Sequence, residues 1–251
     1  MISTKGKSTK RLFIIVGMKG GTGKSTTAVL LAFILRSLGF EVAVYDGDAA
    51  VSTTYLTLRE ALVPEEDQSP VHGAVRYDMR NPDEANTLLL SLDAGTNAVI
   101  HDLPGGTIGD IDELFRTDFS DGLSEITGFA GSLGYEIVVV HLITPDRANP
   151  ASMQGFMNGF GAEAKYVAVL NRGLLRKGET FDTWLNSTER TDFLDLNGTE
   201  IEMPAIPGPL HKFGLAGLIN PDSLDRYQQH LQNLFVRELN KQLGLILEML
   251  E

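Results

Sequence analysis

The feature that most constrains the fold of this chain is an apolar run followed directly by a glycine-rich loop and an amphipathic segment. Residues 12–16 are β-branched, aromatic or leucine side chains and end at Gly17, as expected of a strand buried on both faces. Residues 25–38 then place apolar side chains at helical spacing and stop before Gly39. A second apolar run, 41–45, completes a strand–helix–strand unit, whose strands should be parallel with a right-handed crossover.

The same alternation recurs along the chain and predicts an α/β fold, a doubly wound and mostly parallel sheet flanked by helices. The further elements that we expect are strands near 73–77, 97–101, 136–141 and 166–170, and helices at 82–92 and within 173–197. No linker divides the chain, so we expect a single domain over residues 11–251. It should end in one long amphipathic helix, 223–250, in which Gly244 is the candidate interruption.

Composition excludes several classes of protein. The chain has 251 residues, 43% of them hydrophobic, which suffices for one large α/β core. It contains no cysteine, so neither a disulfide framework nor a thiolate-ligated metal site can form. No apolar run reaches the length of a membrane span, so we expect a soluble, cytoplasmic protein. Glu248 and Glu251 near the tip of the final helix also oppose binding to an anionic membrane.

The net charge of −12 argues against nucleic-acid binding by the whole surface, because a general negative field repels phosphates. A local basic patch for non-specific DNA binding is the alternative. One candidate is the N-terminal segment 1–10, which we expect to be a flexible basic tail. The candidate cations are Lys5, Lys7, Lys10 and Arg11 in or beside this segment, and Arg172, Arg176, Lys177, Arg190, Lys212 and Arg226 elsewhere.

The loop after the first strand is suited to bind phosphate. Closely spaced glycines let consecutive backbone N–H groups turn toward one point, and the helix N-terminus adds partial positive charge. Lys24 should reach the β- and γ-phosphates, the hydroxyl of Ser25 should ligate Mg²⁺, and Thr26 should touch the α-phosphate. The predicted nucleotide-binding residues of the loop are Gly20, Gly21, Thr22, Gly23, Lys24, Ser25 and Thr26.

Lys19 has no role in a standard phosphate-binding loop. The pattern Lys-Gly-Gly-x-Gly-Lys followed by Ser or Thr, matched from Lys19 to Ser25, resembles the deviant Walker A ATPases, the ParA/MinD family of plasmid-partition, cell-division-positioning and related proteins. By this resemblance, Lys19 is catalytic and reaches across a dimer to the partner's nucleotide, where its charge acts as an arginine finger does. The resemblance also implies ATP and Mg²⁺ as cofactors, slow hydrolysis, an ATP-dependent homodimer and an activating partner protein.

Two acidic motifs add to the resemblance. Asp46-Gly47-Asp48, at the end of the second strand, is similar to the family's switch I, and by that match Asp48 orients the attacking water and Asp46 helps to hold the Mg²⁺ shell. A solvated turn is the alternative interpretation of Asp48. The strand 98–101 ends in Asp102-Leu103-Pro104-Gly105-Gly106, which is similar to a Walker B aspartate plus switch II. Asp102 would contact Mg²⁺ through a water, and the glycine pair would allow backbone movement.

The later part of the chain carries the residues that the resemblance assigns to the base. Asn171 follows a strand where relatives carry an asparagine that hydrogen-bonds adenine, although a simple turn residue is the alternative. The segment 206–210, with Pro207, is similar to the family's proline-containing loop that packs against the base. No Asn-Lys-x-Asp guanine signature is present, so the resemblance favours adenine. His101 and His141 are interpreted as core residues and not as metal ligands.

Three functions follow from these patterns. The leading one is an ATPase switch that drives partition, positioning or transfer of plasmid DNA or another cargo. Ala49 and Ala50 follow Asp48 in place of the family's Pro-Gln, which leaves the DNA-partition subtype open. The alternative is a P-loop synthetase or maturation-factor ATPase acting on a small molecule or client protein, though metal insertion normally needs cysteine or histidine ligands. A non-hydrolysing adaptor is the third, and the retained Asp48 speaks against it.

Overall fold

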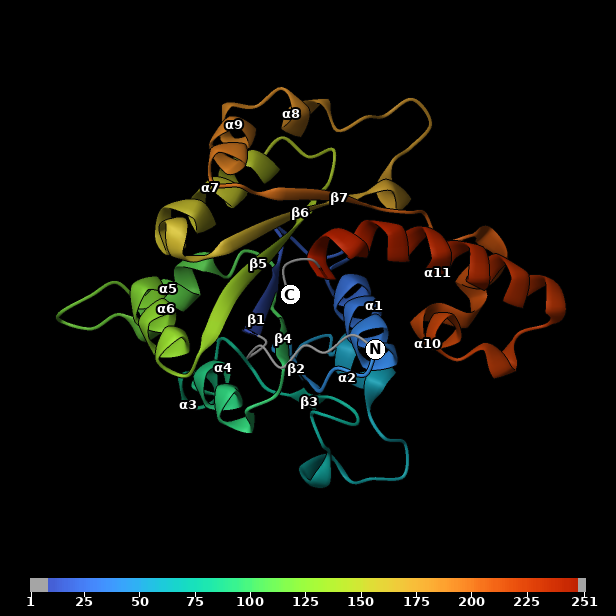
Figure 1. Cartoon of the computed structure of the whole chain (residues 1–251), viewed down its shortest axis with the longest axis horizontal. Coiled ribbons are helices and arrows are strands. Elements are labelled where there is room, and N and C mark those ends of the chain that lie inside the picture. The colour runs from blue at the N-terminus through green and yellow to red at the C-terminus, as the bar shows by residue number, and fades with distance from the viewer. Residues whose placement is uncertain (1–8, 248–251) are drawn as a thin grey trace, which may run out of the picture.

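The computed structural model describes residues 9–247, and within them seven strands form one parallel sheet in the order β3-β2-β4-β1-β5-β6-β7 (Figure 1). The strands are β1 (Lys10–Val16), β2 (Val42–Asp46), β3 (Val75–Arg76), β4 (Ala98–Asp102), β5 (Tyr135–Ile143), β6 (Lys165–Asn171) and β7 (Thr199–Met203). Because β1 lies in the middle of the order, the loop that follows it opens at the centre of the carboxyl edge of the sheet.

Helices connect the strands and cover both faces of the sheet. They are α1 (Lys24–Ser37), α2 (Thr53–Leu58), α3 (Pro82–Ala85), α4 (Thr87–Leu90), α5 (Ile108–Phe115), α6 (Gly122–Ser132), α7 (Asn149–Phe160), α8 (Asp182–Leu185), α9 (Thr188–Asp195), α10 (Gly214–Ile219) and α11 (Arg226–Leu247). Short 3-10 turns occur at Glu65–Asp67, Ser91–Ala94, Gly161–Glu163, Arg172–Leu174, Gly208–Phe213 and Pro221–Ser223. Among the helices of this described part, none is long and apolar enough to cross a membrane.

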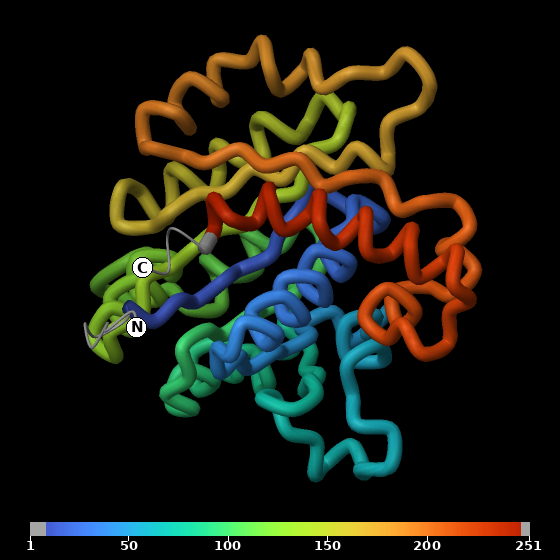
Figure 2. Tube along the Cα trace, turned by 45° about the vertical axis from the view of Figure 1, so that its right-hand side comes forward, coloured from blue at the N-terminus to red at the C-terminus, as the bar shows by residue number. Residues whose placement is uncertain are grey.

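Two apolar cores lie on opposite faces of the sheet, and β1 contributes to both. Leu12, Ile14 and Val16 belong to the core covered by α3 to α9, whereas Phe13 and Ile15 belong to the core covered by α1, α10 and α11. Figure 2 shows α11 lying beside α1 on this second face. Successive side chains of a strand point to opposite faces, so a strand buried on both sides needs a continuous apolar run. The sequence of β1 meets this requirement, and the predicted doubly wound α/β fold is confirmed.

Several boundaries differ from the sequence expectations. The helix expected over 82–92 is two short helices, α3 and α4, and a 3-10 turn, although it starts as predicted, with the side chain of Asn81 accepting a hydrogen bond from the amide of Asp83. The helix α11 runs through Gly244 without interruption up to Leu247. The seventh strand, β7, was not expected. Residues 1–8, most of the expected basic tail, and Glu248 and Glu251 lie outside the described residues.

Candidate functional site

The carboxyl ends of the strands bring the motifs of the sequence together. Asp46 at the end of β2 is in register with Asp102 at the end of β4, and Asn171 of β6 is in register with Met203 of β7. A pocket of about 460 Å³ opens at this edge. It is lined by Gly20, Gly21, Gly23, Lys24, Ser25, Thr26, Asp48, Val51, Thr53, Asn171, Gly173, Leu174, Met203, Pro204, Ile206 and His211. An open α/β sheet places its ligand site at such an edge.

Glycine is required at the start of α1. Gly23 has φ +99°, in the left-handed region, and a Cβ there would lie 2.4 Å from Nδ2 of Asn171. Asn171 comes this close because its Nδ2 donates a 2.9 Å hydrogen bond to the carbonyl of Thr22, while its Oδ1 accepts one of 3.0 Å from the amide of Gly173. The buried side chain of Asn171 therefore fixes the glycine loop against the end of β6.

The glycine loop and the start of α1 form a basic nest. Lys24 is buried, and its Nζ donates a 3.3 Å hydrogen bond to the carbonyl of Lys19, so the loop is wrapped around this ammonium group. No acidic residue lies in the first turn of α1, and no side chain caps its first amides. Free amides and the partial positive charge of a helix N-terminus favour an anion. The loop thus has the groups that a phosphate needs.

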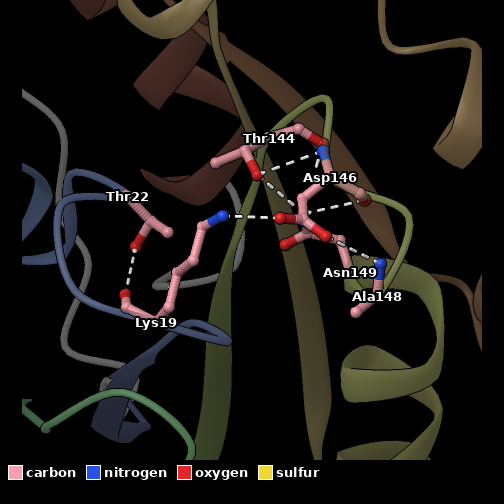
Figure 3. A network of polar contacts seen from close by, with 6 residues as sticks. All are labelled: Lys19, Thr22, Thr144, Asp146, Ala148 and Asn149. Carbon is pink, nitrogen blue, oxygen red and sulfur yellow. Dashed lines mark hydrogen bonds and ion pairs between the residues drawn. The ribbon is translucent and has the colours of Figure 1, made fainter.

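Lys19 is absent from the described residues that line the pocket. Its Nζ lies 2.5 Å from Oδ2 of Asp146, in the loop after β5, as Figure 3 shows. The other oxygen of Asp146 accepts a 3.0 Å hydrogen bond from the amide of Ala148, and the hydrogen bond from Lys19 holds the pKa of Asp146 below its ordinary value. The loop itself is fixed by Asn149, whose Nδ2 donates to Oγ1 of Thr144 at 2.7 Å. With 55% of its side chain exposed, Lys19 is accessible to another molecule.

The two aspartates at the strand ends differ in their partners. Both oxygens of Asp46 accept backbone hydrogen bonds, Oδ1 from Asp48 at 3.1 Å and Oδ2 from Tyr55 at 2.9 Å. Asp46 therefore holds the predicted switch I and the start of α2 together. In Asp102, Oδ2 accepts a 2.7 Å hydrogen bond from the hydroxyl of Thr54, whereas Oδ1 is buried and has no partner within residues 9–247.

The environment of Asp102 fits a divalent cation. Burial, with the charge of Asp46 adding to it, raises the pKa of Asp102 to about 7, although the hydrogen bond from Thr54, the nearby hydroxyl of Ser25 and the charge of Lys24 lower it. An unpartnered buried carboxylate oxygen beside a serine hydroxyl is a hard donor set, which suits Mg²⁺. The residues present are therefore compatible with the predicted magnesium site at Ser25 and Asp102.

The glycine pair after β4 packs against the phosphate loop. A Cβ at Gly105 would lie 2.8 Å from Cα of Lys19, so only glycine fits at this contact. The amide of Gly106 donates a 3.1 Å hydrogen bond to the carbonyl of Gly17. On its other side, the carbonyl of Gly105 accepts a 3.0 Å hydrogen bond from Nη2 of Arg80. The predicted switch II thus touches the backbone of the loop directly.

Two predicted nucleotide-binding residues do not present their side chains to the pocket. The Oγ1 of Thr22 donates to the carbonyl of Lys19 at 3.3 Å, and its side chain is buried against the loop. Pro207 is absent from the described residues that line the pocket, whereas Pro204 and Ile206, which follow β7, and His211 of the 3-10 turn at 208–213 belong to its wall.

Other residues of the site had no clear signal in the sequence. They are Thr54, Asp146, Pro204 and His211. Thr54 and Asp146 contact residues that are far away in the chain. Pro204 and His211 follow β7, a strand that was not recognised in the sequence, so their distance from its end was unknown.

The two histidines that were weighed as metal ligands have internal partners. His101 is fully buried between the hydroxyls of Tyr77 and Ser91, both at 2.9 Å, which confirms its interpretation as a core residue. His141 is also fully buried, with Nε2 2.9 Å from the hydroxyl of Ser152. Burial lowers the pKa of His101 to about 3 and that of His141 to about 4.

Among the candidate cations, ion pairs join Arg11 to Glu136, Arg172 to Glu202 and Arg190 to Glu200.

The fold and the site together define a phosphate-loop domain of the parallel α/β class. Residues 13–249 match the CobQ/CobB/MinD/ParA nucleotide binding domain, and the chain belongs to this family. The resemblance noted from Lys19 to Ser25 is thereby confirmed at the level of the family, and so is the general function of nucleotide binding. No curated protein sequence matches the chain.

Several solved structures are similar to this chain, and one of them, with a TM-score above 0.5, shows the same fold. A putative plasmid partition protein from Borrelia burgdorferi B31, bound to AMPPNP, is 16% identical, with 92% of this chain and 99% of that chain covered and a TM-score of 0.51. The septum site-determining protein MinD from Pyrococcus horikoshii OT3, complexed with Mg-ADP, is 19% identical, with coverage of 94% and 98% and a TM-score of 0.48. The MinD cell division protein of Aquifex aeolicus is 16% identical, with coverage of 92% and 97% and a TM-score of 0.47.

Proposed function

We propose that this chain is a cytoplasmic ATPase switch that binds Mg-ATP, closes face to face with a second copy and hydrolyses ATP slowly. The observation that carries the proposal is the direction of Lys19. This residue opens the phosphate loop, yet its side chain leaves the chain's own pocket and is more than half exposed. A cation in this position is available to the nucleotide of a facing molecule.

Electrostatics supports such a sandwich. The triphosphate of ATP is highly anionic, and the described residues that line the pocket include one ammonium group, that of Lys24. In a water-poor interface a second ammonium, contributed by Lys19 of the facing copy, would neutralise charge that develops on the transferred phosphoryl group. Two identical copies would each give and receive one such lysine, which makes the contact symmetric.

The other residues of the pocket receive the following roles. The amides of the loop and Lys24 bind the phosphates, and Thr26 contacts the α-phosphate end. Ser25 and Asp102 would hold Mg²⁺, which neutralises phosphate charge when bound. Asp46 contributes by fixing switch I through its two backbone hydrogen bonds. Asp48, which lines the pocket, orients the attacking water.

Adenine is the proposed base. Asn171 lines the pocket and uses one N–H and one lone pair within the protein, so its amide keeps a second N–H and a second lone pair for the base. Pro204 and Ile206 provide the apolar surface that the sequence had assigned to Pro207. This switch would drive partition, positioning or transfer of plasmid DNA or another cargo. An activating partner protein would stimulate it.

The replacement Lys19→Ala tests the proposal. We expect the variant to bind Mg-ATP with near wild-type affinity but to lose both ATP-dependent dimerisation, measured by light scattering, and hydrolysis. Lys241→Ala is the matched control, because Lys241 is an exposed lysine paired with Glu238 on α11. Retention of both activities in Lys19→Ala would show that the lysine does not act across an interface. Calorimetry that detects no affinity for Mg-ATP in the wild-type chain would refute the function altogether.

A further inference from the structure

Thr54 is a fully buried hydroxyl at the centre of the strand ends. It is the second residue of α2, and its Oγ1 lies 2.7 Å from Oδ2 of Asp102 and 3.5 Å from the carbonyl of Ser25. A hydroxyl has one proton to donate, and the shorter contact is the one at ideal distance. Thr54 therefore donates to the carboxylate of Asp102.

The position of Thr54 is fixed by the segment that precedes it. The amide of the next residue, Tyr55, donates to Oδ2 of Asp46, and the amide of Ser52 donates to the carbonyl of Asp48 at 2.8 Å. The first turn of α2 is thus held to the end of β2 on both sides of Thr54. Because Asp46 and Asp102 are in register on neighbouring strands, this turn places the hydroxyl over the end of β4.

The hydrogen bond from Thr54 leaves the two oxygens of Asp102 unequal. Oδ2 is occupied, and rotation of the carboxylate would break a 2.7 Å contact. Oδ1 is buried and accepts no hydrogen bond within residues 9–247, although the hydroxyl of Ser25 lies close enough to affect the pKa of this carboxylate. A buried polar atom without a partner is costly, so native proteins retain one mainly where a ligand, an ion or a water completes it.

We propose that Thr54 is a positioning residue of the magnesium site: it occupies one oxygen of Asp102 and so presents the other to the cation or to a water of its shell. The inference rests on the proposed function, because it assumes that Mg²⁺ accompanies the nucleotide. Groups that orient a metal ligand commonly change metal affinity when they are removed. A threonine that only filled space in the core would affect folding and would leave the dependence on Mg²⁺ unchanged.

The test compares ADP binding to the purified full chain with saturating Mg²⁺ and with EDTA, by calorimetry. ADP avoids turnover, and the ratio of the two affinities isolates the contribution of the cation. In Thr54→Val, which keeps the shape and removes the donor, we expect this ratio to fall about 10- to 100-fold while the affinity in EDTA stays near wild type. Thr54→Ser keeps the hydroxyl and should restore the ratio.

Thr57 provides a matched control on the same helix. Its hydroxyl donates to the carbonyl of Thr53 within α2, so Thr57→Val removes a threonine hydroxyl without touching Asp102. Its Mg²⁺ ratio should equal that of the wild type. Thermal unfolding of each variant establishes that it is folded, and Thr54→Ala replaces Thr54→Val in the comparison if the valine variant does not fold.

The outcomes separate this inference from the proposed function. If Thr54→Val, or its substitute Thr54→Ala, shows the wild-type ratio of ADP affinities with Mg²⁺ and with EDTA, the role of Thr54 is wrong. The ATPase proposal would be unaffected by that result. An equal loss of affinity in Mg²⁺ and in EDTA would also overturn the role of Thr54, because that pattern indicates a general defect of the pocket. A wild-type chain whose affinity for ADP is absent under both conditions would instead refute the proposed function, and the inference with it.

Discussion

Lys19 and Asp146 are 127 positions apart in the sequence, yet their side chains form an ion pair across the mouth of the phosphate loop. The pair gives the lysine a partner within its own chain. Exposed pairs of this kind are weak, since solvent screens both charges. A phosphate group of a second molecule could therefore displace Asp146, and the ion pair would compete with any contact that Lys19 makes in a dimer.

Replacement of Asp146 by Asn should favour the ATP-dependent dimer. The amide keeps an oxygen for the amide of Ala148 but removes the charge that holds Lys19. We expect the protein concentration at half-maximal dimerisation with ATP to fall about two- to thirtyfold, as suits the loss of one screened pair in each of the two copies. Light scattering across a dilution series measures it. Glu238→Gln, which breaks the exposed pair with Lys241, should leave the curve unchanged, and an unchanged curve for Asp146→Asn would show that the pair does not compete.

Gly23 and Gly39 allow steric exclusion to be separated from backbone strain. Both have positive φ, +99° and +88°, but a Cβ at Gly39 meets nothing within 4 Å, whereas at Gly23 it meets Asn171. We expect Gly39→Ala to lower the free energy of unfolding by about 1 kcal/mol and to keep nucleotide binding. Gly23→Ala should cost more and abolish binding. Urea denaturation and calorimetry measure the two effects, and nucleotide binding by Gly23→Ala would contradict the role given to this contact.

His141 should make stability depend on pH in a defined direction. Burial lowers its pKa in the folded chain to about 4, so between pH 6.5 and 4 the unfolded chain binds more of this proton than the folded chain. The contribution of His141 is therefore complete above pH 6.5 and is lost as the pH falls through 4, by roughly 3 kcal/mol at most. In chemical denaturation from pH 4.5 to 8, His141→Gln should flatten the decline. His72→Gln, at an exposed histidine, should not.

Arg190 should contribute to stability and not to DNA retention. Its guanidinium donates two 2.8 Å hydrogen bonds to Glu200, which also accepts one from the indole of Trp184. Arg190→Ala leaves a partly buried carboxylate without its cation, so we expect the free energy of unfolding to fall by about 1 to 2 kcal/mol. Arg176→Ala, at an exposed position, should leave stability unchanged. A DNA-retention assay in which Arg190→Ala loses binding at unchanged stability would contradict this assignment.

The phosphate loop could be predicted from sequence because all of its determinants lie within one short stretch. The strand, the glycines and the start of α1 are consecutive, and each has a local signal. The positions of Asp46 and Asp102 follow from the rule that parallel strands end at one edge. For the same reason the family and the doubly wound fold were correct from the sequence, whereas the nucleotide site at this edge stays a prediction.

The rest depended on contacts that no local pattern encodes. In β7, Glu200 and Glu202 alternate with Ile201 and Met203, which is the period-two pattern of a half-buried strand, but only two apolar residues carry it and it was overlooked. Thr54 is one of several adjacent hydroxyl residues, and only the approach of β4 determines which of them is buried against Asp102. The apolar wall of the pocket is formed by Pro204 and Ile206 and not by Pro207. The end of β7 determines which residues after the strand reach the pocket, and this strand was not recognised in the sequence.

The contact between Gly105 and the backbone of Lys19 leaves no room for a methyl group, so the two segments touch backbone to backbone. A movement of the segment after β4 toward the loop would displace the backbone of Lys19, whose side chain is 55% exposed. The end of β4, where Asp102 lies, is thus linked to a half-exposed lysine by backbone contact alone, outside the two apolar cores.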